Sequence, residues 1–280
     1  MNNLEALNFG IKFLKKNKIE SYKIDSELLL CNVLKLSREN LLINLDKILK
    51  NESYKKYKKL LHRRKKKEPM AYIIKKKEFW KNKFFVNNNV LIPRPETEII
   101  VEEILNRIDL KASKNLLDVG TGSGCIILSI IKERSNCKGT AIDISKKALK
   151  VAKTNAKIHH LENKIKFENI DIDKFKHCKY DFIVSNPPYI KKVDLYRLEE
   201  GIRLFEPIIA LNAGLDGLTE IKKLILRSKK LLKINGKLIF EIGLNQKEII
   251  KDFLIKNGYY INKICKDLSF KPRVIISTIL

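Results

Sequence analysis

Residues 185–190, SNPPYI, place a polar amide, two prolines and a tyrosine directly after the apolar run DFIV. That run has the composition of a buried strand, and two prolines cannot continue a sheet because neither has a backbone N–H. Asn186 supplies an acceptor oxygen, Pro187 and Pro188 leave carbonyl groups free of any strand ladder, and Tyr189 supplies an aromatic face. Two acceptors and a π face suit a planar –NH2 group on an sp2 carbon.

Such a nitrogen is a poor nucleophile because its lone pair is delocalised. Fixed acceptors for both of its N–H bonds would hold the nitrogen in place and let it become pyramidal toward an electrophile. The stretch therefore predicts a site for chemistry at an amino nitrogen. A plain turn without any chemistry is the alternative.

A second candidate site lies in residues 116–124, LLDVGTGSG, where an apolar strand runs into a glycine-rich turn that opens a helix. Gly120, Gly122 and Gly124 let the backbone turn tightly and approach a ligand where a Cβ would clash. The dinucleotide pattern G-x-G-x-x-G is not met, because a cysteine stands at its last position, so a different nucleoside ligand is indicated. Asp143 follows the next strand, roughly 20 residues after the loop, where a carboxylate can accept from both ribose hydroxyls. An ordinary turn with a capping aspartate is the competing interpretation.

The elements that must position these residues alternate between strand and helix from Pro93 onward. The expected strands are 115–119, 139–143, 165–169, 181–185 and 237–242, and the expected helices are 96–108, 123–134, 145–158, 218–233 and 245–256. This alternation predicts an α/β fold whose parallel sheet is covered on both faces. Two further β-rich runs, 259–265 and 273–279, predict a C-terminal hairpin that adds antiparallel strands. The glycine-rich loop and SNPPYI would then share the carboxyl edge of the sheet, where such folds bind ligands.

Residues 1–71 have apolar side chains at helical spacing and predict a small helical bundle. Asp25 or Ser26 is the expected cap of its second helix, Ser37 that of the third, and 51–67 would form the fourth. The bundle has too little apolar area to be a catalytic core, so it is expected to recognise a substrate.

Residues 72–93 change to a β-rich composition with a turn near Lys81. They predict a β-hairpin that links the bundle to a catalytic domain at 94–280.

The net charge of +26, from 58 Lys and Arg against 32 Asp and Glu, permits a nucleic-acid partner. The basic residues are spread along the whole chain, apart from the run 54–67, and a compositional bias explains them as well. No apolar stretch approaches the roughly 20 residues that span a bilayer, and the N-terminus does not have the pattern of a signal peptide. The five scattered cysteines form no C-x-x-C pair. We therefore expect a cytoplasmic protein with no metal, no membrane attachment and no stable nucleic-acid binding.

VGTGSG, Asp143 and NPPY together resemble the class I S-adenosylmethionine-dependent methyltransferases that act on amino nitrogens. Further motifs narrow the resemblance to the peptide chain release factor glutamine methyltransferases. These motifs are DSELLL (25–30), SRENLL (37–42), EPMAYII (68–74), EFW (78–80), VLIPRPETE (90–98), FEP (205–207), GLDGL (214–218) and EIG (241–243) with Gln246. The chain departs from the family pattern at Lys75, where glycine is usual.

The resemblance implies a Rossmann-like seven-stranded sheet with an N-terminal helical bundle joined by the hairpin. It also implies methylation, with S-adenosylmethionine, of the side-chain amide nitrogen of the glutamine in the Gly-Gly-Gln motif of class I peptide chain release factors. Catalysis is implied for Asn186, Pro187 and Tyr189: the Asn186 oxygen and the Pro187 carbonyl would accept the two amide hydrogens, and the Tyr189 ring would pack on the amide plane. The residues implied to bind the cofactor are Gly120, Thr121, Gly122, Ser123, Gly124, Asp143, Asp171, Ile172 and Asn186. Those implied to contact the substrate are Asn186, Pro187, Pro188, Tyr189, Arg94 and Glu98.

Three other functions stay open at this level. A glutamine methyltransferase of a ribosomal protein shares EPMAYII and LIPRPETE, and the DSELLL bundle distinguishes the two. An adenine-N6 methyltransferase of nucleic acid would need a target-recognition domain, and none is evident beyond the bundle. A non-catalytic nucleic-acid-binding module would not need GTGSG, Asp143 and NPPY intact.

Overall fold

The computed structural model describes residues 1–176 and 179–279 and divides into two compact units. The first unit comprises residues 1–75 together with 199–205, and the second comprises 76–198 and 206–280. Helix α9 (Glu200–Phe205) therefore belongs with the N-terminal helices, which the sequence analysis did not anticipate.

The first unit is a helical bundle, as expected. Its N-terminal helices are α1 (Asn3–Lys16), α2 (Tyr22–Leu34), α3 (Arg38–Ile43), α4 (Asn51–Lys65) and α5 (Met70–Ile74). All five contribute apolar side chains to one core, which includes the fully buried Leu14, Leu30 and Leu61.

The expected cap of the second helix is wrong, because α2 begins at Tyr22 and includes Asp25 and Ser26 in its first turns. Asp25 is 3% exposed and accepts hydrogen bonds from Arg64 Nε at 2.6 Å and from Ser21 Oγ at 2.6 Å. A buried ion pair with α4, rather than a capping role, explains the carboxylate at this position. Ser37 caps α3 as expected, since its hydroxyl accepts the backbone N–H of Asn40.

The hairpin consists of β1 (Lys77–Phe79) and β2 (Asn82–Phe84), which pair antiparallel around a turn at Trp80 and Lys81. The β-rich region begins later than expected, because Tyr72 lies inside α5.

Lys75 ends α5 in the left-handed conformation, with a φ of 57°. Glycine adopts this conformation without steric cost, which is the physical reason for a glycine at the end of such a helix.

The second unit contains a seven-stranded sheet with the order β5-β4-β3-β6-β7-β9-β8. Its strands are β3 (Asn115–Val119), β4 (Lys138–Asp143), β5 (Ile165–Asn169), β6 (Tyr180–Ser185), β7 (Leu232–Glu241), β8 (Tyr259–Lys266) and β9 (Pro272–Ile279). Strands β5, β4, β3, β6 and β7 pair with their neighbours in parallel. Strand β9 pairs antiparallel with β7, and β8 pairs antiparallel with β9 at the edge of the sheet. The predicted parallel sheet with a C-terminal hairpin is confirmed.

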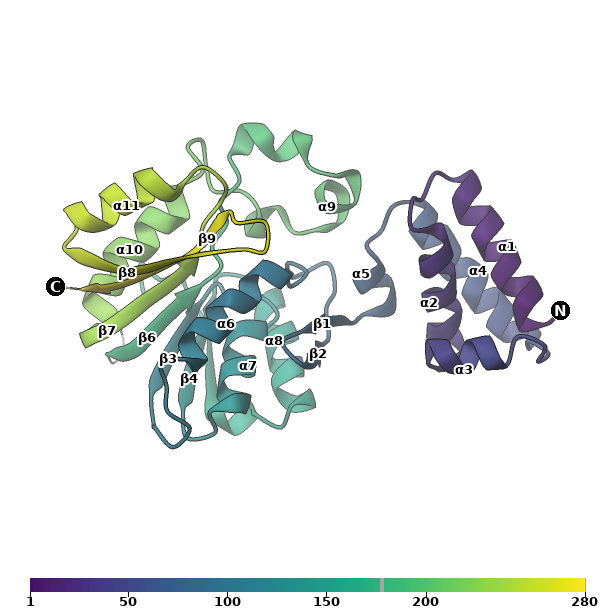
Figure 1. Cartoon of the computed structure of the whole chain (residues 1–280), viewed down its shortest axis with the longest axis horizontal. Helices are drawn as coiled ribbons and strands as arrows, with labels where there is room; N and C mark the ends of the chain where they lie inside the picture. Colours follow the sequence, from purple (N-terminus) through teal and green to yellow (C-terminus); the bar gives the residue numbers. More distant parts are fainter. Residues whose placement is uncertain (177–178, 280) are drawn as a thin grey trace. The chain divides into compact units, whose positions relative to one another are not determined.

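Helices cover both faces of this sheet (Figure 1). One face carries α6 (Glu98–Leu105), α7 (Cys125–Glu133) and α8 (Lys146–Ile158), and the other carries α10 (Thr219–Leu231) and α11 (Lys247–Lys256). Successive strand residues point to opposite faces, so Leu116 packs in the core under α7 while Leu117 packs in the core with α10. Short 3-10 turns complete the unit: η1 (Pro95–Thr97), η2 (Glu162–Lys164), η3 (Lys192–Arg197) and η4 (Ile208–Ala210).

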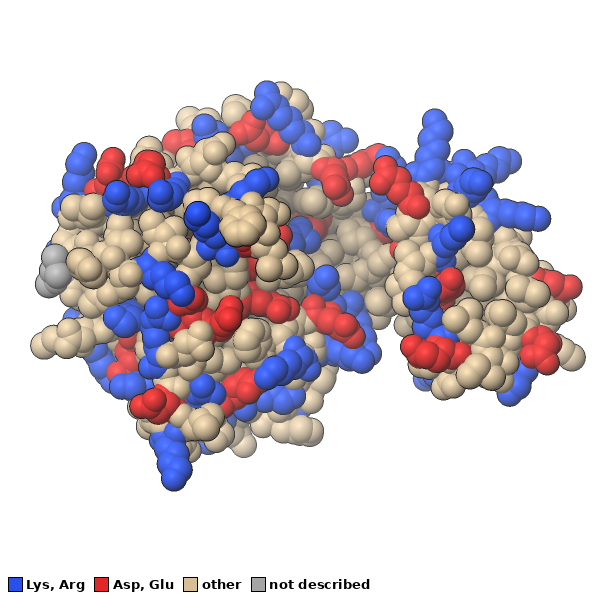
Figure 2. Space-filling model, in the orientation of Figure 1, with Lys and Arg blue, Asp and Glu red and all other residues tan. Residues whose placement is uncertain are grey.

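The basic residues lie among acidic ones on the face of the molecule shown in Figure 2. Part of the run 54–67 is structural, because Arg64 pairs with Asp25 and Arg63 pairs with Glu68. Within the described residues, no helix is both long and apolar enough to cross a bilayer. The same residues contain no group of three or more His, Cys, Asp or Glu side chains placed to hold a metal ion. The described cysteines are buried free thiols, and Cys178 lies outside the described residues.

Candidate active site

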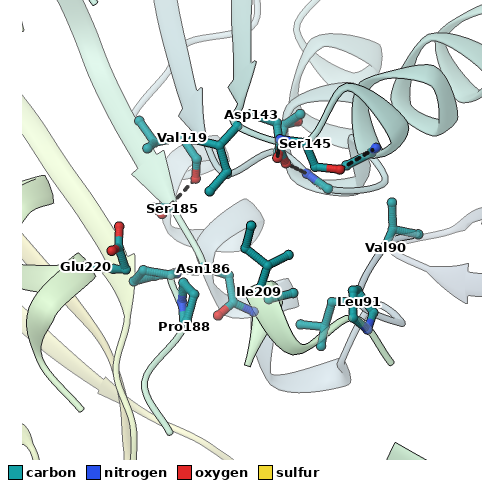
Figure 3. Close-up of a pocket in the computed structure, with 18 of the residues that line it drawn as sticks. Val90, Leu91, Val119, Asp143, Ser145, Ser185, Asn186, Pro188, Ile209 and Glu220 are labelled. Atoms are coloured by element: carbon teal, nitrogen blue, oxygen red, sulfur yellow. Dashed lines mark hydrogen bonds between the residues drawn. The ribbon is translucent and has the colours of Figure 1, made fainter. Parts of the chain in front are cut away.

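A cavity of about 290 Å³ opens at the carboxyl ends of β3, β4 and β6. Its lining comes from the segments that follow strands, 119–123, 142–145, 170–172 and 185–188, and from residues 89–91 and 207–210. Figure 3 shows Asp143 and Ser145 on one side of this space and Asn186 with Pro188 on another. The sheet therefore brings the glycine-rich loop, Asp143 and NPPY to one cavity, as the sequence predicted.

The glycine-rich loop uses its glycines for two different purposes. Gly120 has a φ of 69°, and a Cβ added to it would meet no atom within 4 Å, so its backbone is open to a ligand. Gly124 has a φ of 81°, and a Cβ there would lie 2.9 Å from Leu128 Cδ1 and 3.3 Å from Ala152 Cβ. Gly120 lines the cavity, whereas Gly124 lets α7 and α8 pack closely and is not among the lining residues.

Asp143 is held by the backbone around it. Its Oδ2 accepts the N–H of Gly122 at 3.0 Å and its Oδ1 accepts the N–H of Ser145 at 2.8 Å. The residue is 9% exposed, and burial raises the pKa of its carboxyl, against the two N–H donors that lower it. Each oxygen keeps acceptor capacity for a hydroxyl donor in the cavity.

Thr121, Ser123, Asp171 and Ile172, predicted from the family resemblance, all line the cavity. Sequence reasoning missed Asp118, which is fully buried at the end of β3 and accepts from Thr121 Oγ1 at 2.7 Å. Burial raises the pKa of Asp118 to about 7. The signal for it was present, because a carboxylate interrupts the apolar run of LLDV.

The NPPY segment begins where β6 ends. Ser185 Oγ donates to the Val119 carbonyl at 2.8 Å and so ties the ends of β6 and β3 together (Figure 3). Asn186 Nδ2 donates to Thr97 Oγ1 at 2.9 Å, while Asn186, Pro187 and Pro188 line the cavity. One of the two N–H bonds of Asn186 is therefore engaged by Thr97, and the binding of a ligand by the Asn186 oxygen stays a prediction.

Tyr189 is hydrogen-bonded through both its side chain and its backbone. Its hydroxyl donates to Glu241 Oε1 at 3.2 Å, and its backbone carbonyl accepts from Gln246 Nε2 at 3.1 Å. Burial and the nearby Glu241 carboxylate raise the pKa of the Tyr189 hydroxyl. Tyr189 is not among the residues that line the cavity. The packing of its ring on a substrate amide stays a prediction.

Arg94 and Glu98 have structural partners inside the second unit. Arg94 Nη2 lies 2.6 Å from Oε1 of the buried Glu206, whose other oxygen accepts the N–H of Ile92 at 3.2 Å. Glu98 Oε1 accepts the N–H of Trp80 at 2.9 Å and so holds the hairpin turn. Neither Arg94 nor Glu98 lines the cavity, and their contact with a substrate stays a prediction.

Sequence reasoning also missed the roles of Thr97, Glu206 and Glu241. All three lie inside motifs already singled out, VLIPRPETE, FEP and EIG, and all three are buried polar residues. Glu206 of FEP forms an ion pair with Arg94 of VLIPRPETE. Glu241 of EIG accepts hydrogen bonds from Thr97 and Tyr189. Three motifs far apart in the chain therefore meet around NPPY.

S-adenosylmethionine fits this arrangement of residues. The open backbone at Gly120 gives a ligand close access, and Asp143 presents a carboxylate to the same space. The volume lies near the lower limit of roughly 300 Å³ for small-molecule sites. The lining combines apolar side chains such as Ile172 with polar ones such as Asp143 and Asn186, as small-molecule sites do.

Comparison with known proteins agrees with this geometry. Residues 5–74 match the PrmC N-terminal domain family, and residues 95–202 match the methyltransferase small domain family. A methyltransferase from Pyrococcus furiosus has a similar fold, with a TM-score of 0.52 and 20% identity over 70% of this chain and 87% of that one.

Curated relatives match over nearly the whole chain. The release factor glutamine methyltransferase of Clostridium acetobutylicum is 38% identical over 276 residues, which cover 98% of this chain and 97% of the relative. That of Leptospira interrogans is 40% identical over 283 residues, with 98% and 97% covered. The chain also spans about half, 55%, of a bifunctional methyltransferase of Rickettsia felis at 38% identity. The chain belongs to the family of release factor glutamine methyltransferases.

Proposed function

We propose that the protein transfers the methyl group of S-adenosylmethionine to the side-chain amide nitrogen of the glutamine in the Gly-Gly-Gln motif of class I peptide chain release factors. The observation that carries this proposal is the hydrogen bond between the Asn186 side-chain amide and Thr97. One of the two N–H bonds of Asn186 is engaged by Thr97 and the residue lines the cavity, which supports its oxygen as the acceptor for a substrate.

When bound, the cofactor would supply an electrophilic methyl group on a sulfonium: the nitrogen–methyl bond forms as the sulfur–methyl bond breaks, and the sulfur is left as a neutral thioether. Gly120 and Gly122 give the backbone approach, and Asp143 accepts from the ribose hydroxyls. Asp143 needs no reorganisation for this role, because Gly122 and Ser145 already fix its carboxylate. Asp171 and Ile172 line the cavity next to it and are proposed to hold the adenosine part.

Asn186 and Pro187 bind the substrate amide. Asn186 Oδ1 and the Pro187 carbonyl accept its two N–H bonds, which fixes the nitrogen and supports its change to a pyramidal geometry. The methylated nitrogen is acidic enough to lose its proton to solvent, so the site does not require a general base. Ile208 and Ile209 line the cavity although more than half of each side chain is exposed, so they offer apolar contact to an incoming peptide.

The names of the most similar relatives support release factors as the partner, and we propose that the reaction takes place in the cytoplasm, where translation ends. The proposal includes no metal, membrane or stable nucleic-acid partner. The bundle of residues 1–75 is proposed to bind the remainder of the release factor.

The test is mass spectrometry of a purified class I release factor after incubation with the full-length protein and methyl-labelled S-adenosylmethionine. We expect one methyl group on the peptide that contains Gly-Gly-Gln. A release factor in which that glutamine is replaced by alanine is the matched control and should stay unlabelled. Label in a ribosomal protein or on adenine of nucleic acid, with none in the release factor, would contradict the proposal.

A further inference from the structure

Four side chains form a continuous chain of hydrogen bonds that begins at the cavity wall, where Asn186 and Thr97 line the space, and ends at Glu241 and Tyr189, which do not line it. Asn186 Nδ2 lies 2.9 Å from Thr97 Oγ1, Thr97 Oγ1 lies 2.5 Å from Glu241 Oε2, and Tyr189 Oη lies 3.2 Å from Glu241 Oε1. Thr97 belongs to η1, Glu241 ends β7, and Asn186 and Tyr189 follow β6. Thr97 is 2% exposed and Glu241 is 1% exposed, so water does not substitute for these partners.

When Glu241 is ionised, the chemistry of each group fixes the direction of this chain. An ionised carboxylate only accepts, so Thr97 must give its single hydroxyl hydrogen to Glu241. The Thr97 oxygen is then an acceptor toward Asn186, and only the N–H end of the Asn186 amide can satisfy it. The oxygen end of that amide is therefore directed to the substrate. The other Glu241 oxygen accepts the hydroxyl hydrogen of Tyr189. Glu241 therefore contacts the last residue of NPPY directly and the first, Asn186, through Thr97.

We propose that Thr97 and Glu241 are positioning residues that determine which end of the Asn186 amide faces the substrate. This inference rests on the proposed function, in which Asn186 Oδ1 accepts a hydrogen from the glutamine amide. The reversed amide would present N–H donors to N–H donors, and the substrate nitrogen would lose one of its two fixed acceptors. Neither residue touches the reacting atoms in this role, because each acts through Asn186.

The first test compares Thr97→Val with Thr97→Ser. Valine has nearly the same shape but no hydroxyl, so Asn186 loses the partner that orients it. We expect kcat for release factor methylation to fall by about 100-fold, the loss typical of a misplaced reacting group. The KM for the release factor and the Kd for S-adenosylmethionine should change little. Thr97→Ser keeps the hydroxyl and should restore most of kcat.

Ser277→Ala is the matched control for losing a buried hydroxyl. Ser277 lies on β9 in the same sheet, is fully buried, and bonds the Leu238 carbonyl at 3.5 Å outside the chain of four residues. This variant should keep the parent kcat. Thermal unfolding of each variant shows whether it is folded. A folded Thr97→Val with the parent kcat would overturn the inference.

A second test reverses the direction of the chain. In Asn186→Asp, two carboxylates compete for the one hydrogen of Thr97, so we expect only partial activity. Adding Glu241→Gln supplies an N–H donor to Thr97, whose hydrogen is then free for the carboxylate at position 186. The double variant should exceed Asn186→Asp by roughly tenfold in kcat, within the range measured for interacting pairs. Glu241→Gln alone should be less active than the parent. Strictly multiplicative effects of the two substitutions would contradict the inference.

A third measurement separates this inference from the proposed function, because it needs no methyl transfer. The side-chain NH2 of Asn186 is assigned in a 15N-labelled protein by its absence from Asn186→Ala. Its NMR signals should shift strongly in Thr97→Val and stay near the parent position in Thr97→Ser. If the protein fails to methylate a release factor but shows these shifts, the proposed function fails and the orientation of Asn186 stands. If methylation occurs and the NH2 signals do not shift in Thr97→Val, the inference about Thr97 and Glu241 is wrong and the proposed function stands.

Discussion

Asp143 accepts the backbone N–H of Gly122 at 3.0 Å, so the carboxylate proposed to bind the ribose also holds the glycine-rich loop in place. The carboxyl end of β4 is thereby coupled to the turn that follows β3. Removing the carboxylate has two effects on a ligand in this cavity, the loss of its own hydrogen bonds and a less ordered loop.

Asp143→Ala should therefore weaken S-adenosylmethionine binding by roughly 2–4 kcal/mol, because charge-assisted hydrogen bonds are lost. Isothermal titration calorimetry measures this change. Asp216→Ala is the matched control, since Asp216 accepts the N–H of Leu218 in a similar local turn but does not line the cavity. Unchanged affinity in Asp143→Ala would remove Asp143 from the cofactor site.

Asn186→Ala should lower the rate of methylation by roughly 100-fold or more and leave cofactor binding nearly intact. The loss of one fixed acceptor in a site that excludes water costs on the order of 3 kcal/mol in the transition state. Single-turnover kinetics with a release factor, together with calorimetry for the cofactor, separate the two effects. Methylation at the parent rate by the folded variant would mean that NPPY only shapes a turn.

The raised pKa of Glu241 predicts that the free energy of unfolding depends on pH. Burial raises the pKa of Glu241 to about 7 from its ordinary 4.5, opposed by the Thr97 and Tyr189 hydrogen bonds and by Arg273, while Glu96 adds to the rise. Between these two values the folded state binds a proton that the unfolded state has lost. The contribution of Glu241 to the free energy of unfolding is therefore greatest below the lower value and falls as pH rises through the higher one. Glu241→Gln removes this slope.

From about pH 4 to about pH 8, the free energy of unfolding of Glu241→Gln should therefore rise by roughly 3 kcal/mol relative to the parent. Urea unfolding at a series of pH values measures this difference. Glu248→Gln, at an exposed glutamate of α11, is the control and should show no such rise. Parallel stability curves for Glu241→Gln and the parent would contradict the prediction.

The same titration predicts the pH dependence of catalysis. Thr97 gives its hydrogen to Glu241 only when the carboxylate is ionised, so kcat should rise with pH and level off above about 7. The groups that face Glu241 are Tyr189, Arg273 and Glu96, and the first two stay in one protonation state over this range. The rise should be absent in Glu241→Gln. A rise of the same size in both proteins would assign it to another group.

Asn155 connects the hairpin to the glycine-rich loop. It is fully buried, accepts the N–H of Phe85 at 2.7 Å, and donates to the carbonyls of Phe85 and Ser123 at 2.9 and 2.8 Å. Asn155→Ala leaves these backbone groups without their partner and should lower the free energy of unfolding by roughly 2–4 kcal/mol. Cofactor affinity should fall as well, because Ser123 lines the cavity.

Chemical denaturation and calorimetry measure both effects. Thr154→Ala, at the exposed neighbour of Asn155 on α8, is the control and should change stability by less than about 0.5 kcal/mol. Equal stability of the two variants would show that Asn155 does not link the hairpin to the loop.

The sequence by itself determined most elements and the residues around the cavity. Predicted strands 115–119 and 165–169 have the bounds observed for β3 and β5. The central strand β3 contains a buried apolar run, whereas the edge strand β5 alternates apolar with charged residues, and both patterns are visible locally. Gly120, Asp143 and Asn186 were identified for a similar reason, since each directly follows a strand and parallel strands bring their carboxyl ends to one edge. The start of α2 was wrong because the partner of Asp25, Arg64, lies 39 positions away.

Only the tertiary structure decided which buried polar groups meet. Thr97 and Glu241 are 144 positions apart, and Arg94 and Glu206 are 112 apart, so no spacing rule connects them. The contact of Thr97 with Glu241 depends on the strand order β3-β6-β7, which places the end of β7 beside NPPY. A buried donor or acceptor without a partner costs about 1–3 kcal/mol, so the packed fold selects partners that local sequence does not specify. The orientation of the Asn186 amide follows from those long-range partners.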